Sequence, residues 1–288
     1  MLNKQDKISY LTVKDYSVSG EVFELMLNPE FEFLETSPQP SLEKLPEYYL
    51  SEDYISHTDS KRNLFEKVYH IIKKRALRRK LNIIDSFSLQ DKTLLDFGCG
   101  TGDFLSSAQQ NNWTVFGIEP NEQARQIANN KTNNSVFGSE QLSKLKDRSF
   151  DVITLWHVLE HLPKLEEHLS VFKRLLKPNG VLIIAVPNFK SYDAEVYKNH
   201  WAAFDVPRHL WHFSRAAIGN LVQFQNMKVI KTKPLLFDAF YVSLLSEKYK
   251  TGHMNPIRAI WIGCLSNLKA FYSKEYSSII YMVKNNNS

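Results

Sequence analysis

Cysteine and long apolar runs are what this sequence most conspicuously lacks. It has two cysteines in 288 residues, Cys99 and Cys264, which excludes a disulfide framework and a four-cysteine zinc site. No run approaches the 18 apolar residues of a transmembrane helix, and the first residues lack the apolar core of a signal peptide. We therefore expect a cytoplasmic protein in a reducing setting, with a packed core built from its 43% hydrophobic residues.

Acidic residues are nearly absent from one stretch, residues 61–80. This stretch holds nine basic residues and one acid, Glu66, while the whole chain has a net charge of +5. Apolar residues recur near helical spacing from Leu64 to Ile84, which predicts a helix over residues 61–86. Its basic face is interpreted either as a solvated surface or as contact with an anionic membrane surface. Nucleic acid is not expected, because no aromatic residues are interleaved with the charges.

Three of the ten glycines follow directly after a short apolar run. Residues Thr93–Phe97 predict a buried strand, and Gly98, Gly100 and Gly102 predict a tight turn before a helix. Helix-start N–H groups point at whatever ligand binds such a turn. The spacing G-x-G-x-G differs from the G-x-G-x-x-G of dinucleotide sites. Asp96 adds a carboxylate that would repel a pyrophosphate and attract a cationic ligand.

A second predicted strand, Thr114–Ile118, ends in Glu119, an acid placed to accept the hydroxyls of a ribose. The segments LLDFGCGTGDFL and VFGIEP together resemble the class I S-adenosylmethionine-dependent methyltransferases, and the resemblance covers roughly residues 93–188. It implies S-adenosylmethionine as the cofactor. It also implies that the following residues bind it: Asp96, Gly98, Cys99, Gly100, Gly102, Glu119, Pro120, Ser139, Glu140 and Trp156. Ser139 stands where many relatives have aspartate, so Glu140 is the substitute acid.

The expected fold class is α/β, a doubly wound, mostly parallel sheet of seven strands. From residue 91 the chain alternates predicted strands and helices, as such a sheet requires. Further strands are predicted at 135–137, 150–155, 181–186, 227–231 and 277–283, and helices at 121–130, 164–176 and 215–224. Residues 177–180 are predicted to end a helix, and residues 188–214 show little regular pattern. Residues 235–272 are predicted as a helical insertion that forms a lid, an added layer or a homodimer surface.

The first 60 residues are predicted as a separate hairpin and connector, followed by the methyltransferase domain over 61–288. Two strands are expected at 8–13 and 21–27. The layout resembles a methyltransferase subgroup with a small zinc ribbon here, but this chain lacks its cysteines. We therefore expect a hairpin without metal, with His57, Glu30 and Glu32 as the alternative zinc ligands.

Methyl transfer from a sulfonium requires alignment and, for a weak nucleophile, removal of a proton. The fourth strand leads into Trp156, His157, Glu160 and His161, near the carboxyl edge of the sheet where ligands bind. Methyltransferases of the ubiquinone pathway carry E-V-x-E-H here, a pattern associated with a divalent metal. The first acid is His157 in this chain, which weakens the metal pattern, so no metal ligand is assigned and a metal site stays open as an alternative. A general-base role for His157 or His161 and a structural hydrogen bond of His161 are the alternatives.

A second cluster extends from Trp201 to Ser214 and resembles the W-x-x-x-D-x-P-R-H-L-x-H-F-S segment of a broad methyltransferase subgroup. His209 is the preferred base, and Trp201, Arg208 and His212 are predicted to bind the acceptor. Arg208 would clamp an anion, because a guanidinium binds carboxylate or phosphate bidentately. In the alternative interpretation Arg208 pairs with Asp205 and the histidines brace the loop.

These features predict methyl transfer from S-adenosylmethionine to a small or lipid-like acceptor, at oxygen. Two alternatives stay open: a binding protein that keeps the cofactor pocket without catalysis, and a nicotinamide-dependent oxidoreductase. The second would require the longer glycine spacing and no acid at the position of Asp96.

Overall fold

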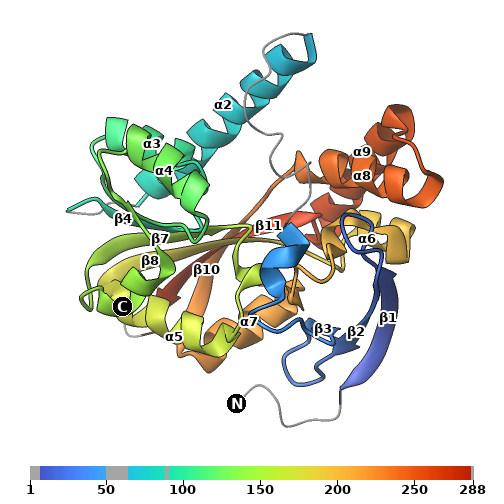
Figure 1. The fold of residues 1–288 in the computed structure, drawn as a ribbon, viewed down its shortest axis with the longest axis horizontal. Coiled ribbons are helices and arrows are strands. Elements are labelled where there is room, and N and C mark those ends of the chain that lie inside the picture. Colours follow the sequence, from blue (N-terminus) through green and yellow to red (C-terminus); the bar gives the residue numbers. More distant parts are fainter. Residues whose placement is uncertain (1–6, 50–63, 88–90, 287–288) are drawn as a thin grey trace.

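The computed structural model describes residues 7–49, 64–87 and 91–286 (Figure 1). Its main feature is a seven-stranded sheet in the order β10-β11-β8-β7-β4-β5-β6, in which β11 runs antiparallel to its neighbours. The strands are β4 (Thr93–Phe97), β5 (Thr114–Ile118), β6 (Val136–Phe137), β7 (Phe150–Trp156), β8 (Leu176–Pro187), β10 (Met227–Pro234) and β11 (Ser278–Asn285). This arrangement confirms the predicted α/β fold.

Helices cover both faces of the sheet, because the central strands are apolar on both sides. On one face pack α2 (Leu64–Asp85), α3 (Asp103–Gln110) and α4 (Glu122–Lys131). On the other face pack α5 (Leu165–Leu175) and α7 (Arg215–Phe224). The Ser214 side chain accepts a hydrogen bond from the Ala217 N–H and thereby fixes the start of α7 where the sequence predicts it. The predicted start of the first helix at residue 61 lies outside the described residues.

A second, four-stranded antiparallel sheet is built from β1 (Ile8–Lys14), β2 (Val22–Leu27), β3 (Leu34–Ser37) and β9 (Trp211–His212). The two strands of the predicted hairpin, β1 and β2, are therefore present. A third strand that was not predicted, β3, pairs with β9 from the second cluster, through Leu34 with His212 and Glu35 with Trp211. Phe31 and Phe33 join the core beneath the main sheet. The N-terminal segment is thus packed onto the main sheet and paired with β9. The predicted boundary at residue 60 and His57 lie outside the described residues.

Residues 188–214 are more regular than expected. They contain α6 (Tyr192–Tyr197), the short 3₁₀ helices η4 (Lys198–His200) and η5 (Ala202–Phe204), and β9. These elements are short, so their sequence shows no clear period, and buried hydrogen bonds hold them. Asp193, which is fully buried, accepts hydrogen bonds from Trp201, Ser266 and Ser277. Tertiary contacts with distant segments decide the structure here.

Strand β8 begins earlier than predicted. Leu176 pairs with Phe150, and after an irregularity Val181 pairs with Val152, so residues 177–180 form a bulge within the strand instead of ending the helix.

The predicted insertion is a helical hairpin, α8 (Asp238–Thr251) and α9 (Pro256–Ser273), which packs beside α6. Shorter 3₁₀ helices are η1 (Leu45–Tyr49), η2 (Ser139–Lys144) and η3 (Leu159–His161). No helix in the described ranges is both long and apolar enough to span a bilayer.

Candidate functional site

The glycine turn connects β4 to α3 at the carboxyl edge of the sheet. Gly98, Gly100 and Gly102 all have φ in the left-handed region, at 74°, 54° and 75°. A Cβ on Gly98 would lie 2.5 Å from a methyl carbon of Val158, and one on Gly102 would lie 2.8 Å from the Ala128 Cβ. A Cβ on Gly100 would meet no described atom within 4 Å. Gly98 and Gly102 are therefore required by packing, whereas the backbone at Gly100 faces open space.

Asp96 lies at the end of β4 and is 2% exposed. Its Oδ1 accepts a hydrogen bond of 2.6 Å from the Thr154 hydroxyl on the adjacent β7. Burial raises the pKa of Asp96 to about 6, although this hydrogen bond and the nearby Lys80 act in the opposite direction. A cationic ligand group would stabilise this buried carboxylate.

Glu119 directly follows β5 and contacts the glycine turn between β4 and α3. Its carboxylate accepts hydrogen bonds from the N–H of Gly100 at 2.8 Å and of Asn121 at 2.9 Å. Burial raises its pKa above the usual value, and the two N–H groups oppose this change. The side chain therefore fixes the turn, and its remaining lone pairs are available to hydroxyl donors.

The other predicted cofactor residues lie around this turn with different degrees of exposure. Burial raises the pKa of the Cys99 thiol, so this cysteine is a packing residue without thiolate character. Pro120 is exposed and its carbonyl accepts from Arg125. Ser139 and Glu140 are exposed at the start of η2, with the Glu140 carboxylate folded against Gly138. These positions border the turn, and their contacts with a cofactor stay predictions.

Trp156 ends β7 and is only partly exposed, yet its indole N–H is buried without a hydrogen-bond partner among the described residues. The Lys80 ammonium lies 4.5 Å from the centroid of its ring. Desolvation lowers the pKa of Lys80, while Asp96 and Asp238 favour its charged form. The unsatisfied indole N–H of Trp156 and the half-buried Lys80 ammonium, which Asp96 attracts, mark this place as a polar site.

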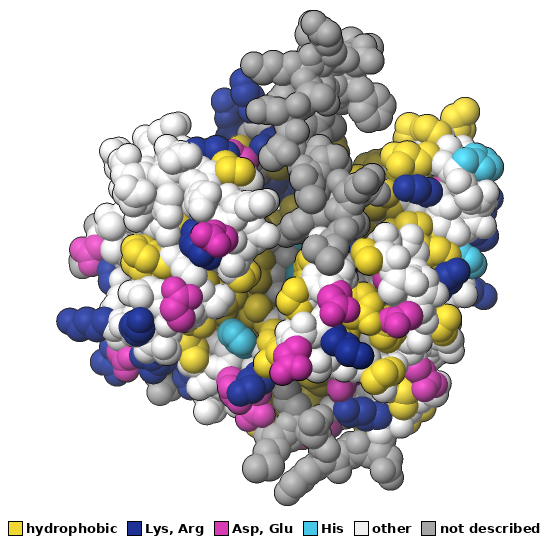
Figure 2. Space-filling model, in the orientation of Figure 1, with side chains coloured by type: hydrophobic (Ala, Val, Ile, Leu, Met, Phe, Trp, Pro, Cys, Tyr) yellow, Lys and Arg dark blue, Asp and Glu magenta, His cyan; other side chains and the backbone are white. Residues whose placement is uncertain are grey.

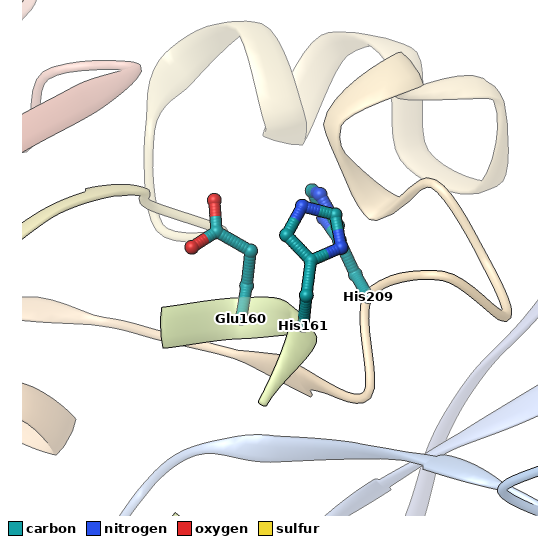
Figure 3. Close-up of side chains that lie close together, drawn as sticks. All are labelled: Glu160, His161 and His209. Carbon is teal, nitrogen blue, oxygen red and sulfur yellow. The ribbon is translucent and has the colours of Figure 1, made fainter. Parts of the chain in front are cut away.

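Glu160, His161 and His209 form a compact cluster (Figure 3). One ligand atom from each lies within 4.8 Å of the others, and the rings of His161 and His209 are 4.6 Å apart. Glu160 and His161 come from η3, whereas His209 comes from the loop before β9. Glu160 is 1% exposed, and neither carboxylate oxygen has a hydrogen-bond partner in the described part of the chain. These three residues could hold a divalent metal.

Backbone carbonyls contact both histidines. The Nδ1 of His209 lies 2.9 Å from the Ala203 carbonyl, and since a carbonyl only accepts, this Nδ1 carries the hydrogen and the Nε2 keeps its lone pair. The Nδ1 of His161 lies between the Arg208 carbonyl at 3.0 Å and the Tyr49 hydroxyl at 3.1 Å, which can donate or accept. Burial and the neighbouring His161 lower the pKa of His209 well below its usual value, so its ring is neutral at neutral pH.

His157 is oriented away from this pair of rings. Its Nε2 lies 3.2 Å from Asp238 at the start of α8, and its Nδ1 lies 3.5 Å from Glu160. Desolvation disfavours the imidazolium, but the two carboxylates outweigh it and raise the pKa of His157 to about 10. A histidine that is already protonated cannot accept a proton at neutral pH. Its geometry favours a role as the counter-ion of Glu160 over the predicted role as base.

The remaining predicted acceptor residues are engaged in structural contacts. The Arg208 guanidinium donates to both Asp205 oxygens and to the Tyr48 carbonyl. Trp201 is 2% exposed. His212 shares a hydrogen bond of 2.9 Å with the Thr36 hydroxyl. The structure thus brings His209 together with His161 and also with His212, whose ring centroid lies 6.3 Å from that of His209. The substrate roles of Trp201 and His212 stay predictions.

Sequence reasoning missed Lys80 and Asp238. Lys80 was treated as one charge of a basic face, although its position three residues after Leu77 and four before Ile84 places it on the apolar side of α2. This spacing was a usable signal. Asp238 reaches His157 only through the tertiary fold, so no local pattern identifies it.

Comparison with known proteins agrees with this geometry. A family profile described as "Methyltransferase domain" matches residues 61–232. Two curated relatives are named ubiquinone biosynthesis O-methyltransferase. The one from Hydrogenovibrio crunogenus is 28% identical over 39% of this chain and 51% of its own length, and the one from Nitrosomonas europaea is 29% identical over 48% and 68%. The chain therefore spans about half to two thirds of these relatives.

Among solved structures, magnesium protoporphyrin IX methyltransferase from Synechocystis, with bound S-adenosylhomocysteine, superimposes with a TM-score of 0.54. The match covers 84% of this chain and 99% of that chain at 15% identity. At this identity the likeness supports the fold.

Proposed function

This chain belongs to the methyltransferase domain family and is an S-adenosylmethionine-dependent methyltransferase, and from that premise we propose that it methylates an oxygen atom of a small or lipid-like acceptor. The names of the two relatives support oxygen as the methylated atom. The single observation that carries the proposal is the buried cluster of Glu160, His161 and His209, which is suited to remove a proton from a hydroxyl group.

The residues around the glycine turn fit S-adenosylmethionine. Gly100 leaves open space beside the backbone, and the buried Trp156 N–H lacks a described partner. Asp96 offers a buried carboxylate to the cationic methionine portion, and Glu119 offers acceptors to the ribose hydroxyls. The cofactor supplies a methyl group already activated on a sulfonium. The protein therefore needs to align an acceptor, exclude water and remove a proton where the nucleophile is weak.

We assign proton removal to the two histidines of this cluster. A hydroxyl loses its proton only with difficulty at neutral pH, so an oxygen acceptor requires a base at this place. His209 is our preferred base, because its ring is neutral and the Ala203 carbonyl holds it in the tautomer with a free Nε2 lone pair, and His161 is the second. The Glu160 carboxylate stabilises the imidazolium that forms.

For an anionic acceptor, Arg208 is the recognition residue we propose. Its guanidinium is paired with Asp205 in the present arrangement, so an acceptor carboxylate or phosphate would bind by competing with that pair. A neutral acceptor would leave the pair intact. Weaker binding of neutral analogues of an anionic acceptor would support this role of Arg208.

The test is a release assay for S-adenosylhomocysteine with a panel of phenols, alcohols, amines and carboxylic acids. We expect turnover with a hydroxyl acceptor, and a roughly 100- to 10,000-fold lower kcat in His209→Ala or His161→Ala with unchanged cofactor affinity. His168→Ala, which changes a histidine on α5, serves as the control and should retain activity. Full activity in both cluster variants would contradict the assignment, and a binding protein without catalysis would show no turnover at all.

Activity measured with and without EDTA distinguishes a base role of the two histidines from a role as metal ligands. If the imidazoles act as bases, EDTA leaves the rate unchanged. Loss of activity with EDTA, restored by a divalent ion, would reassign Glu160, His161 and His209 as metal ligands.

A further inference from the structure

Helix α9 carries its large apolar side chains on the solvent side. The residues that face the protein are mostly small: Ala259, Ile262, Gly263, Ser266 and Ala270 are buried. Gly263 permits close approach to α8, since a Cβ there would lie 2.6 Å from the Phe240 ring. A helix on the surface of a soluble protein normally has the opposite arrangement.

The outer face of α9 is a continuous apolar stripe. Its members are Ile257, Ile260, Trp261, Leu268 and Phe271, with exposures of 84%, 57%, 64%, 62% and 61%. Their spacing follows i, i+3, i+4 along a helix of 18 residues, which is about 27 Å long. Figure 2 shows hydrophobic side chains gathered at the outer end of the α8–α9 hairpin. A contiguous exposed stripe of this kind indicates an interaction surface.

Basic residues predominate around the stripe. Between residues 239 and 274 the basic residues are Lys248, Lys250, Arg258, Lys269 and Lys274, and the acid within this segment is Glu247. The acids at its two borders are already paired, Asp238 with His157 and Glu275 with Arg215. Glu247 is fully buried, where it accepts from the Tyr197 hydroxyl and pairs with Arg258. The surface that accompanies the apolar stripe is therefore positive.

We propose that this face, named here the α9 face and defined by the five apolar residues above, docks onto an anionic lipid bilayer. Large apolar and aromatic side chains bordered by lysine and arginine are the pattern of helices that lie in the plane of a membrane interface. A second copy of the chain fits less well, because a two-fold pair would bring together two rims in which basic residues predominate.

The basic helix α2 is on the same side. Lys74, Arg75 and Arg78 are exposed on it, and Figure 1 shows α2 and the α8–α9 hairpin extending beyond the sheet in the same direction. Both would contribute attraction to anionic headgroups, each basic residue near the surface adding to the affinity.

The α9 face also borders the site. The Asn267 side chain donates to the Leu236 carbonyl, and Leu236 and Phe237, which precede α8, are 40% and 53% exposed. The next residue, Asp238, contacts His157. Docking would thus place the catalytic cluster close to the bilayer. This last step rests on the proposed function and deepens it, since the acceptor would then be a lipid or a lipid-linked molecule.

The experiment is co-sedimentation of the full chain with phosphatidylcholine vesicles, with and without phosphatidylglycerol, without cofactor or acceptor. We expect at least about tenfold tighter binding to the anionic vesicles, weakened by salt. The double variant Trp261→Ser/Leu268→Ser should bind at least about tenfold more weakly. The matched control, Val22→Ser/Leu42→Ser, removes exposed apolar side chains from the N-terminal segment and should bind as the parent does.

Tryptophan emission adds an independent measurement. Trp261 is 64% exposed, Trp156 is partly exposed, and Trp113, Trp201 and Trp211 are 3%, 2% and 7% exposed. Anionic vesicles should therefore shift the emission of the parent to shorter wavelength, and Trp261→Phe should lose most of this shift. Absence of vesicle binding would overturn the proposal, and so would a dimer in solution that the double variant dissociates. Because binding is measured without methyl transfer, and cofactor affinity of the double variant is measured in parallel, failure of docking is distinguishable from failure of the proposed function.

Discussion

Replacing Asp96 with asparagine should stabilise the protein at neutral pH while weakening its binding of cofactor. Burial raises the pKa of Asp96 from 3.8 to about 6, so the folded state disfavours the carboxylate. Asparagine resembles the protonated acid and can still accept the hydrogen bond that Thr154 donates. One pKa unit corresponds to 1.36 kcal/mol, so the ionised carboxylate costs up to about 3 kcal/mol of folding free energy.

The sign of the pH dependence follows from the two pKa values. Below about pH 4 the carboxyl is protonated in both states, and Asp96→Asn should match the parent. Between about pH 4 and 6 the unfolded chain ionises first, so the parent loses stability as pH rises and the variant does not. Above pH 6 the difference should stay constant, in favour of the variant.

Urea unfolding of both proteins across pH 4 to 8 measures this difference. Asp151→Asn on the same sheet is the matched control. Burial would raise the pKa of Asp151, but hydrogen bonds from Lys177 and Thr93 outweigh it and lower the pKa. That substitution should therefore destabilise the protein above pH 4. A variant at Asp96 that is less stable than the parent at pH 8, or a difference independent of pH, would refute the reasoning.

Three further substitutions test other parts of the account. Gly100→Ala forces a side chain into the left-handed region at φ 54°, so we expect a loss of about 1 kcal/mol in urea unfolding and at least about tenfold weaker cofactor binding by calorimetry. Arg208 is 9% exposed, so Asp205→Asn, which removes the carboxylate paired with its guanidinium, should cost about 3 kcal/mol of folding free energy. Adding Arg208→Met to this variant should recover part of that loss. His209→Ala should lower kcat roughly 100- to 10,000-fold but leave the calorimetric affinity for S-adenosylmethionine unchanged, and a matching loss of affinity would place His209 in the cofactor site.

Local signals were sufficient for most of the fold. The glycine turn, the buried strands of the main sheet and helix α7 all follow from short-range patterns: left-handed glycines, continuous apolar runs and the Ser214 cap. They could be predicted because each pattern excludes other backbone conformations. Residues 188–214 could not, because buried polar contacts such as those of Asp193 form only between distant segments.

The candidate site likewise has one part that follows from local sequence patterns and one part that depends on tertiary contacts. Asp96 lies near the end of β4 and Glu119 directly follows β5, so the strand ends fix both acids. The sequence predicts both as cofactor residues, which stays a prediction. The cluster of Glu160, His161 and His209 depends on the loop before β9 meeting η3, where the Leu210 N–H donates to the Glu160 carbonyl. The sequence selected His161 and His209 separately but did not indicate that they touch. The pairing of Arg208 with Asp205 matches the structural alternative.

Calorimetric titration with S-adenosylmethionine, S-adenosylhomocysteine, NAD and NADP is the most direct test of where the cofactor binds. We expect one site per chain for the two adenosyl ligands, no binding of the nicotinamide cofactors, and loss of binding in Glu119→Ala. At about 100 times its Kd, the bound ligand should also stabilise the fold by about 2.7 kcal/mol. Undiminished binding of S-adenosylmethionine by folded Glu119→Ala and Asp96→Asn would contradict the assignment of the glycine turn as the cofactor site.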